Sequence, residues 1–301
     1  MRTAAALLAA LATSAALAAC GGGAEPGASQ EASLVLDFTP NAAHAGIYAA
    51  LDRGYYRKAG VDLTVRAPSS STDAPKLLAA GKTDFAILDI HDLAIDRKRG
   101  LPIVGVAPIV DRPLASVIAG DRSTVRTPAD LAGKTVGVTG LPSDNAVLNQ
   151  VLRAGGLQPD AVKRVTIGFG AVPALAAGRV DAATGFWNAE GVTLERRGVP
   201  VRVFRVDDFG APSYPELVLA TSRETLGKDP RLVREVVDAT KRGYAVARQD
   251  PSAALSALVG ADPSLNEGEA AAELRALNAA NAFSPHLPPG KLARLVQRGL
   301  S

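Results

Sequence analysis

A lone tryptophan and an acidic residue close to it are the residues of this sequence that most clearly indicate a binding site. Trp187 is the only tryptophan in 301 residues, and it stands in Phe186-Trp-Asn-Ala-Glu-Gly191 beside Asn188 and Glu190. An aromatic ring facing a flat ligand contributes about 0.5–1.5 kcal/mol beyond its buried area, and a carboxylate can accept hydrogen bonds from an amine and a ring N–H. The segment predicts recognition of a planar nitrogen heterocycle. Two structural alternatives stay open: Trp187 could plug a lobe interface, and Glu190 could cap or pair on a helix.

A second group of candidates follows the first predicted strand. Leu34-Val-Leu36 is a short apolar run, and Phe38, Asn41 and His44 come soon after it. In an open α/β sheet, ligands bind outside the carboxyl ends of the strands, so these side chains stand where a small molecule would lie. We expect Phe38 and Trp187 to enclose a ligand ring, and the Asn41 amide, which donates and accepts, to contact its polar edge. His44 more often packs at a helix start than it contacts a ligand.

Each of the remaining candidates could serve either a structural role or a role in ligand binding. Asp89 and Asp144 could be N-caps, since an Asp side chain satisfies free backbone N–H groups at a helix start. The run Gly140-Leu-Pro-Ser-Asp144 could instead present those N–H groups to a ligand oxygen or phosphate. Tyr214 and Glu216 lie at a predicted crossing between two halves of the chain, where a hinge role and a ligand role are equally open. The candidates of this group are Asp89, Gly140, Ser143, Asp144, Tyr214 and Glu216.

The elements that must position these residues alternate between strand and helix along most of the chain. This alternation predicts α/β layers in two lobes with mixed sheets joined by a hinge. We expect residues 33–120 and 213–301 to form lobe 1 and residues 121–212 to form lobe 2. The crossings between the lobes are predicted near residues 115–126 and 207–216, and the apolar run 216–221 is expected to return to lobe 1 as a strand. Such lobes close around a ligand by rotating about the crossings.

The N-terminus is expected to be a targeting signal and not part of the folded domain. Arg2 is followed by a run of Ala and Leu that is short for a membrane anchor, which needs about 20 apolar residues, and is typical of a signal peptide over 1–19. The run ends at Leu17-Ala-Ala-Cys-Gly21, which resembles a bacterial lipobox, so lipidation is predicted at Cys20. Residues 20–32 then form a flexible tether. Cys20 is the only cysteine, so no disulfide framework and no cysteine-based metal site is expected.

Composition excludes several functional classes. The formal net charge is +3 and becomes +2 once Arg2 is removed, which offers no electrostatic case for nucleic acid. After the leader, about 280 residues remain, enough for two lobes. No later stretch is long and apolar enough to cross a membrane.

Several motifs give the chain a resemblance to a known family. They are Leu36-Asp-Phe-Thr-Pro-Asn41 with His44 and Gly46, Gly54-Tyr-Tyr-Arg-Lys-Ala-Gly-Val-Asp-Leu63, Gly140-Leu-Pro-Ser-Asp144, Phe186-Trp-Asn-Ala-Glu-Gly191, and Asp208-Phe-Gly-Ala-Pro-Ser-Tyr-Pro-Glu-Leu-Val-Leu219. With them the chain resembles the substrate-binding lipoproteins of ABC importers in the family related to the fungal thiamine pyrimidine synthases. The resemblance implies a type II periplasmic-binding fold and a ligand that is a pyrimidine precursor of thiamine. It also implies that the permease and the ATPase are separate chains.

An enzyme is the alternative of another class. Resemblance to the fungal synthases implies a lysine that carries pyridoxal phosphate, an active-site histidine and a cysteine-rich segment, and this chain has no cysteine after Cys20. Its three histidines, His44, His91 and His286, stand in separate segments without a metal-binding spacing. No nucleotide-binding or nucleophile motif occurs either. We therefore expect no catalysis, no cofactor and no metal.

Other ligands of the same scaffold remain as rivals, namely riboflavin, sulfonates and nitrate. An anion site would need Arg, Lys or helix N-termini facing the cleft, whereas the residues predicted there are Asp37, Asn41, Asp89 and Glu190. We expect a monomer on the extracytoplasmic face of the cell membrane, anchored through lipid on Cys20. It captures a small heteroaromatic ligand of the aminomethylpyrimidine type for salvage.

Overall fold

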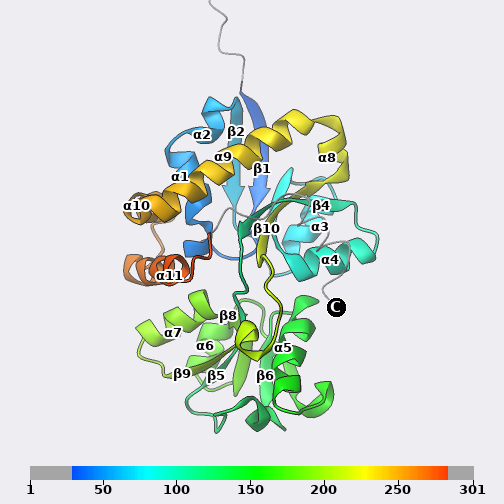
Figure 1. Cartoon of the computed structure of the whole chain (residues 1–301), viewed down its shortest axis with the longest axis vertical. Coiled ribbons are helices and arrows are strands. Elements are labelled where there is room, and N and C mark those ends of the chain that lie inside the picture. Colours follow the sequence, from blue (N-terminus) through cyan, green and yellow to red (C-terminus); the bar gives the residue numbers. More distant parts are fainter. Residues whose placement is uncertain (1–28, 284–301) are drawn as a thin grey trace, which may run out of the picture.

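Two five-stranded mixed sheets form two lobes that are stacked along the long axis of the molecule (Figure 1). The computed structural model describes residues 29–283. The first sheet has the order β2-β1-β3-β10-β4 and the second the order β7-β6-β8-β5-β9. The strands are β1 (Gln30–Val35), β2 (Val61–Arg66), β3 (Phe85–Asp89), β4 (Ile103–Val110), β5 (Ala115–Gly120), β6 (Thr135–Val138), β7 (Lys163–Thr166), β8 (Ala182–Phe186), β9 (Val201–Arg205) and β10 (Leu217–Ser222).

The pairing within each sheet is partly parallel and partly antiparallel. β1 is parallel to β2 and β3, while β10 runs antiparallel between β3 and β4. In the second sheet β6 is parallel to β7 and β8, while β5 runs antiparallel between β8 and β9. The predicted α/β class with mixed sheets in two lobes is confirmed, and β10 returns to the first sheet as expected.

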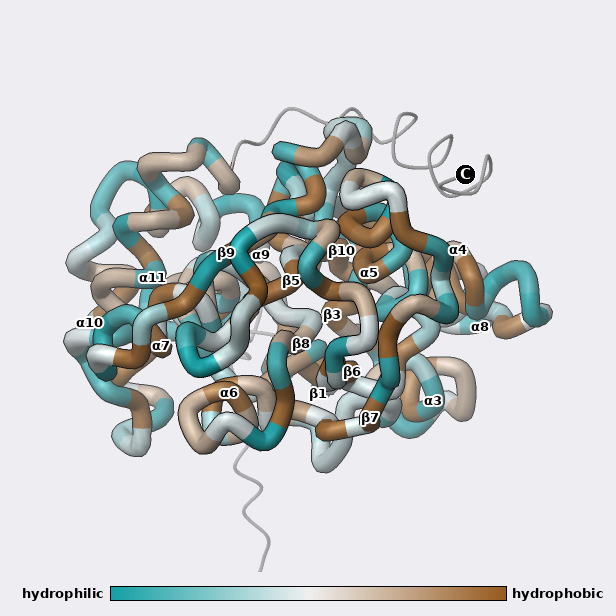
Figure 2. The backbone as a smooth tube through the Cα atoms, turned by 90° about the horizontal axis from the view of Figure 1, so that it is seen from below, coloured by the Kyte–Doolittle hydropathy of each residue, from teal (hydrophilic) through white to brown (hydrophobic). Residues whose placement is uncertain are grey.

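Helices cover both faces of each sheet. Seen from below, the strands run through the middle and helices lie on both sides (Figure 2). The helices are α1 (Ala45–Asp52), α2 (Tyr55–Lys58), α3 (Asp73–Ala79), α4 (Ile90–Lys98), α5 (Ser143–Ala154), α6 (Ala171–Ala176), α7 (Val192–Arg196), α8 (Arg223–Lys228), α9 (Pro230–Gln249), α10 (Pro251–Ala261) and α11 (Glu267–Ala279). Short turns of tighter or wider helix are η1 (Ala42–His44), η2 (Pro128–Leu131), η3 (Pro159–Ala161), η4 (Trp187–Gly191) and η5 (Val206–Phe209).

Because side chains alternate along a strand, neighbouring residues of β1 pack against different helices. Leu34 and Leu36 are fully buried in the cluster that includes Ile47 of α1 and Val236 of α9, whereas Val35 points to the other face. There it joins the cluster that contains residues of α3 and α4. Because successive side chains of a strand point to opposite faces, an unbroken apolar run is what a sheet covered on both sides requires.

The long helix α9 packs closely across α1, with Gly243 facing Gly46 and Ala50 and the Tyr244 ring lying against Gly46. An ideal Cβ on Gly243 would lie 1.9 Å from the carbonyl oxygen of Gly46, so no larger residue fits without separating the helices. The helix begins after Asp229, whose carboxylate accepts from the Leu232 N–H at 2.9 Å. Asp250 ends α9 and caps α10, a helix that the sequence reasoning did not predict.

Two segments cross between the lobes, and one predicted boundary is wrong. β4 belongs to the first sheet and β5 to the second, so the first crossing is residues 111–114 and not 115–126. The expected limit of lobe 1 at residue 120 would have placed β5 in the first sheet, whereas its backbone pairs with β8 and β9. The second crossing lies between β9 and β10, over residues 206–216, where it was expected.

The expected signal peptide, most of the tether, Cys20 and His286 lie outside the described residues. The tether was expected to reach residue 32, and this boundary is wrong, because β1 begins at Gln30 and pairs with β2 from there. Within residues 29–283, no helix combines the length and the apolar character needed to span a bilayer.

Candidate functional site

A cleft between the two lobes collects residues from the carboxyl ends of strands of both sheets. It holds about 830 Å³ free of protein atoms, part of it open to solvent. Its described lining consists of Asp37, Phe38, Asn41, Ser71, Ala74, Pro75, Leu88, Asp89, Asp92, Ala115, Thr139, Leu141, Ser143, Asp144, Val147, Phe169, Thr184, Gly185, Phe186, Ala189 and Glu190. The position agrees with the rule that α/β sheets bind ligands beyond their strand ends.

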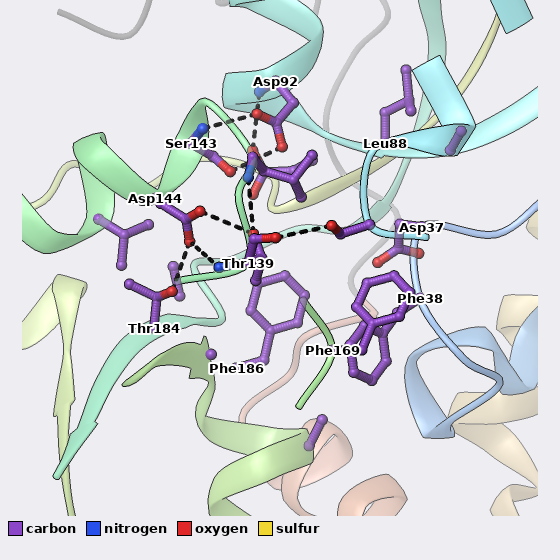
Figure 3. A pocket seen from close by; sticks show the side chains of 18 of the residues that line it. Asp37, Phe38, Leu88, Asp92, Thr139, Ser143, Asp144, Phe169, Thr184 and Phe186 are labelled. Carbon is purple, nitrogen blue, oxygen red and sulfur yellow. Dashed lines mark hydrogen bonds between the residues drawn. The ribbon is translucent and has the colours of Figure 1, made fainter. Parts of the chain in front are cut away.

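Three phenylalanine rings form the aromatic side of the cleft. Phe38 follows β1 in the first lobe, and Phe169 follows β7 in the second. Their ring centroids are 4.4 Å apart at an interplanar angle of 72°, an edge-to-face contact that joins the lobes. Phe186 at the end of β8 contributes the third ring (Figure 3). A flat ring can therefore be held between aromatic faces contributed by both lobes.

Asp37 is held in the cleft by a buried histidine. The Asn41 N–H donates to His44 Nδ1 at 3.2 Å, which leaves Nε2 as the protonated nitrogen. His44 Nε2 then donates to Asp37 Oδ1 at 2.9 Å. His44 is fully buried and lies outside the lining, so it orients Asp37 and does not contact the cleft space itself.

Asn41 lines the cleft, although its amide is partly used by the turn that follows. Its Oδ1 accepts from the Ala43 N–H at 2.8 Å and its Nδ2 donates to the Thr39 carbonyl at 3.0 Å, so Asn41 caps η1. One amide hydrogen and one oxygen lone pair remain for other partners.

Glu190 reaches the cleft from the wide helical turn η4. Its Oε2 accepts from the Phe186 N–H at 2.9 Å. Burial raises the pKa of the Glu190 carboxyl, the Phe186 N–H opposes that rise, and the charge of Asp37 adds to it. An ideal Cβ on Gly185 would lie 3.3 Å from the Glu190 carboxyl carbon, so the glycine leaves room for this side chain. The carboxyl can accept hydrogen bonds from a ligand's amine and ring N–H groups.

Two carboxylates occupy the start of α5. Asp144 accepts from the Thr139 N–H at 3.1 Å, the Gly140 N–H at 2.8 Å and the Thr184 hydroxyl at 2.7 Å. Asp92, on α4 of the other lobe, accepts from the backbone N–H and the hydroxyl of Ser143, each at 2.9 Å. Figure 3 shows the two carboxyl groups at this end of the cleft, away from the Phe38–Phe169 pair. Gly140 itself is not among the lining residues.

Asp89, His91 and Glu216 form a compact group behind the cleft. One ligand atom from each residue lies within 4.8 Å of the others, so these residues have the spacing to hold a cation. Asp89 Oδ1 accepts from the His91 N–H at 2.6 Å and contacts His91 Nδ1 at 3.1 Å, which makes it the N-cap of α4. Burial tends to raise the pKa of the Asp89 carboxyl, but His91 and Glu216 hold it below its usual value. Burial and the charge of Asp89 raise the pKa of Glu216 well above the usual value.

Glu216 and Tyr214 belong to the crossing segments. Glu216 is fully buried, and its Oε2 accepts from the backbone N–H groups of Leu114 and Ala115 in the first crossing. Tyr214 is buried in edge-to-face contact with His91, with centroids 4.6 Å apart. Neither residue is among the cleft lining, so the structure supports the hinge alternative for both.

The expected role of Trp187 as a stacking partner is wrong. Its indole N–H donates to the Pro113 carbonyl at 3.1 Å, and the Arg205 guanidinium lies 4.3 Å from the centre of its ring. Trp187 is therefore packed against the first crossing and does not belong to the described lining, which is the lobe-interface alternative. Phe186 contributes the ring to the cleft instead. Asn188 is fully buried away from the lining, and its amide has no hydrogen-bond partner among the described residues.

Several lining residues were missed by the sequence reasoning. Phe186 was quoted only as part of a motif, and Phe169 and Asp92 were not proposed. Phe169 follows β7, so the rule that placed Phe38 beyond β1 would have found it. Asp92 gave no such signal, because it stands inside α4 and meets the cleft only through the approach of α5.

The lining contains no lysine and no arginine among residues 29–283, while five carboxyl side chains face it. The lining therefore offers no amine for a Schiff base with pyridoxal phosphate, and a family cofactor of that kind does not fit these residues.

Comparison with known proteins gives relatives of two kinds. The formylaminopyrimidine-binding protein of Halalkalibacterium halodurans is 31% identical over 227 residues, which cover 75% of this chain and 69% of that protein. The 4-amino-5-hydroxymethyl-2-methylpyrimidine phosphate synthase of Legionella pneumophila is 25% identical over 236 residues, covering 77% of this chain and 74% of that protein. A binding protein and a synthase thus share this scaffold.

Solved structures show the same fold. The alkanesulfonate-binding protein SsuA of Xanthomonas axonopodis pv. citri superposes with a TM-score of 0.73 at 17% identity, covering 89% of this chain and 90% of that one. At this identity the match establishes the periplasmic-binding architecture and not the ligand. The model of the family described as NMT1/THI5 like matches residues 41–254, most of the described chain. The chain therefore belongs to the NMT1/THI5-like family.

Proposed function

We propose that this chain is the extracytoplasmic substrate-binding lipoprotein of an ABC importer and captures a pyrimidine precursor of thiamine, of the aminomethylpyrimidine type, for salvage. One observation carries the proposal: a cleft between two hinged lobes in which three aromatic rings and five carboxyl groups face the same space, with no cationic side chain among the described lining residues. The 31% identity to a formylaminopyrimidine-binding protein supports the same ligand class.

The ligand ring lies between Phe186 and the Phe38–Phe169 pair. Aromatic contacts of this kind contribute about 0.5–1.5 kcal/mol each beyond the buried area. Glu190 accepts from the exocyclic amine, and Asp37, oriented by His44, accepts from a second donor on the same side of the cleft. An isostere without those donors would leave buried carboxyl oxygens unpaired, which is the basis of selectivity.

Capture and release follow from hinge motion without chemistry. The lobes are joined by residues 111–114 and 206–216, and rotation about these segments opens the cleft. Several contacts join the lobes, among them Phe38 with Phe169, the Ser71 hydroxyl with the Thr139 carbonyl at 2.9 Å, and Asp92 with Ser143. Thr193 of α7 and Arg197 just after it also bond to Glu273 and Glu269 of α11. The closed, loaded protein is the form that a separate permease and its ATPase receive.

The membrane attachment belongs to the same proposal. Lipidation at Cys20 would tether a monomer to the outer face of the cell membrane through the segment before β1. Radiolabelled fatty acid incorporated into the full chain, but not into a Cys20→Ala chain, is the expected result, and label in both chains would contradict it.

A catalytic role like that of the related synthases is not supported by the lining. It has no lysine to carry a pyridoxal group, and the sequence has no cysteine after Cys20. Riboflavin, sulfonate and nitrate are the competing ligands, and the acidic lining disfavours the two anions.

Isothermal titration calorimetry of the chain from residue 21 onward tests the ligand assignment. Aminomethylpyrimidine, formylaminopyrimidine, thiamine, riboflavin, taurine and nitrate are titrated separately. Binding of a pyrimidine, weakened in Phe38→Ala and Glu190→Gln, is expected. Binding of taurine, nitrate or riboflavin in place of every pyrimidine would overturn the proposal.

A further inference from the structure

The start of α5 is built like an anion site whose donors are already taken. A helix N-terminus ordinarily offers free N–H groups and a favourable dipole to phosphate or sulfonate. Here the Ser143 N–H and hydroxyl donate to the two oxygens of Asp92, and the N–H groups of Thr139 and Gly140 donate to Asp144. An anion entering this end would have to displace two carboxylates of the protein.

These two carboxylates also have no cationic partner that would mask their charge. Within the part of the chain that the structure describes, neither Asp92 nor Asp144 forms an ion pair with lysine or arginine, although both are largely buried. Asp89 lies on the same wall of the cleft and adds a further acidic group. Burial first, and then the charge of Asp89, raise the pKa of Asp92 well above its usual value, so Asp92 acts here chiefly by occupying the Ser143 donors. The pKa of Asp89 is lowered, so Asp89 keeps its negative charge.

The arrangement separates the cleft into two ends. Phe38 and Phe169 lie at one end, while Asp92 with Ser143 and Asp144 with Thr184 lie at the other (Figure 3). A pyrimidine ring at the aromatic end directs its substituents toward the carboxylates. A phosphate on such a substituent would meet the charge of Asp89 and donors that Asp92 and Asp144 already occupy, a combination that opposes binding.

We infer that Asp92 and Asp144 determine the charge class of the ligand, so that the cleft accepts unphosphorylated aminopyrimidines, neutral or cationic, and rejects their phosphate esters. The inference rests on the proposed function, which it refines. The informative competitor is hydroxymethylpyrimidine phosphate, because the ester differs from the alcohol only in the group that would face these residues.

The test compares the alcohol with its phosphate ester by isothermal titration calorimetry on the wild-type chain. The ester is expected to bind about a hundredfold more weakly or not at all. Equal affinity for the alcohol and the ester would overturn the inference while leaving the proposed function intact. Failure of every pyrimidine to bind would instead overturn the proposed function.

A residue-level test uses Asp92→Asn with Asp96→Asn as the matched control. Asp96 lies one turn further along α4, outside the described lining, so both variants lose one acidic group from the same helix. Asp92→Asn should raise affinity for the ester by about tenfold and leave affinity for the alcohol within about threefold. An equal gain in both variants would show a general charge effect and overturn the assignment to Asp92. If Asp92→Asn fails to fold by circular dichroism, Asp144→Asn and the wild-type comparison still decide the question.

Discussion

Phe186 and Trp187 are consecutive residues whose side chains point to different places: the Phe186 ring into the cleft and the Trp187 indole toward the first crossing. Phe186 ends β8 and lines the cleft, whereas the Trp187 indole donates to the Pro113 carbonyl in the first crossing. The Trp187 backbone N–H also donates to the Leu114 carbonyl at 3.0 Å. Phe186 therefore lines the cleft, and Trp187 links the second lobe to the first crossing by hydrogen bonds.

Trp187→Phe is expected to destabilise the fold more than it weakens ligand binding. The ring is kept, but the Pro113 carbonyl loses its donor, which should lower the free energy of unfolding by about 1–3 kcal/mol. Urea unfolding followed by circular dichroism measures this loss. Val165→Ala, at a residue that is 37% exposed, is the control and should change stability by about 0.5 kcal/mol or less. Unchanged stability with strongly reduced affinity would place Trp187 at the ligand after all.

Phe186→Ala should show the reverse pattern. Loss of a ring that faces the ligand removes aromatic contact and buried area, so affinity for the pyrimidine should fall about tenfold or more. Calorimetric titration gives the affinity, and Phe204→Ala is the control. Phe204 lies in β9, packs against Phe209 with ring centroids 6.1 Å apart and does not belong to the described lining. A similar loss of affinity in both variants would argue against a direct contact by Phe186.

Gly243→Ala should disrupt the packing of α9 on α1. The added Cβ would stand 1.9 Å from the Gly46 carbonyl oxygen, which is backbone and cannot rotate away. Overpacking of this kind costs about 1–3 kcal/mol or more in the free energy of unfolding. Gly227→Ala in α8 is the matched control, because a Cβ there meets nothing within 4 Å. The control should gain about 0.5–1 kcal/mol from the better helix propensity of alanine. Equal effects in thermal unfolding would contradict the packing argument.

Glu273 should make stability depend on pH. Its carboxylate accepts from the Ala42 N–H at 3.2 Å and from the Thr193 hydroxyl at 3.3 Å, and burial raises its pKa to about 7. Because the pKa is higher in the folded state than in the unfolded chain, the folded state binds more protons between these values. The favourable contribution is complete below the unfolded pKa of about 4.5 and is lost as pH rises through about 7.

Urea unfolding at pH 5, 6, 7 and 8 checks this dependence. The wild type should lose on the order of 2–3 kcal/mol across the range, given about 1.4 kcal/mol for each pKa unit. Glu273→Gln, which can still pair with both partners, should give a flatter profile. Glu267→Gln, at an exposed position of the same helix, should keep the wild-type slope. A wild-type profile as flat as that of Glu273→Gln would contradict the raised pKa.

The sequence alone determined the fold class and the general position of the site. Alternating apolar runs and helix signals predicted two α/β lobes, because burial on both faces of a sheet demands those patterns. The residues after β1 were expected beside a cleft for the same reason, and Phe38 and Asn41, which come soon after the end of that strand at Val35, line it. Local rules offered an N-cap role for Asp89 as the alternative to a ligand role, and the structure shows that N-cap on a residue that also lines the cleft.

Which side chains share the cleft depends on contacts between segments that lie far apart in the sequence. The first crossing lies at 111–114 because the backbone of β5 pairs with β8 and β9, a long-range choice that no local pattern encodes. With this pairing, the Trp187 side chain lies against the first crossing and the Phe186 ring lines the cleft. Asp92 meets Ser143 only because α4 and α5 approach across the lobes. The sequence specifies which residues follow each strand. The direction in which their side chains point, into the cleft or away from it, depends on how segments that are distant in the sequence pack together.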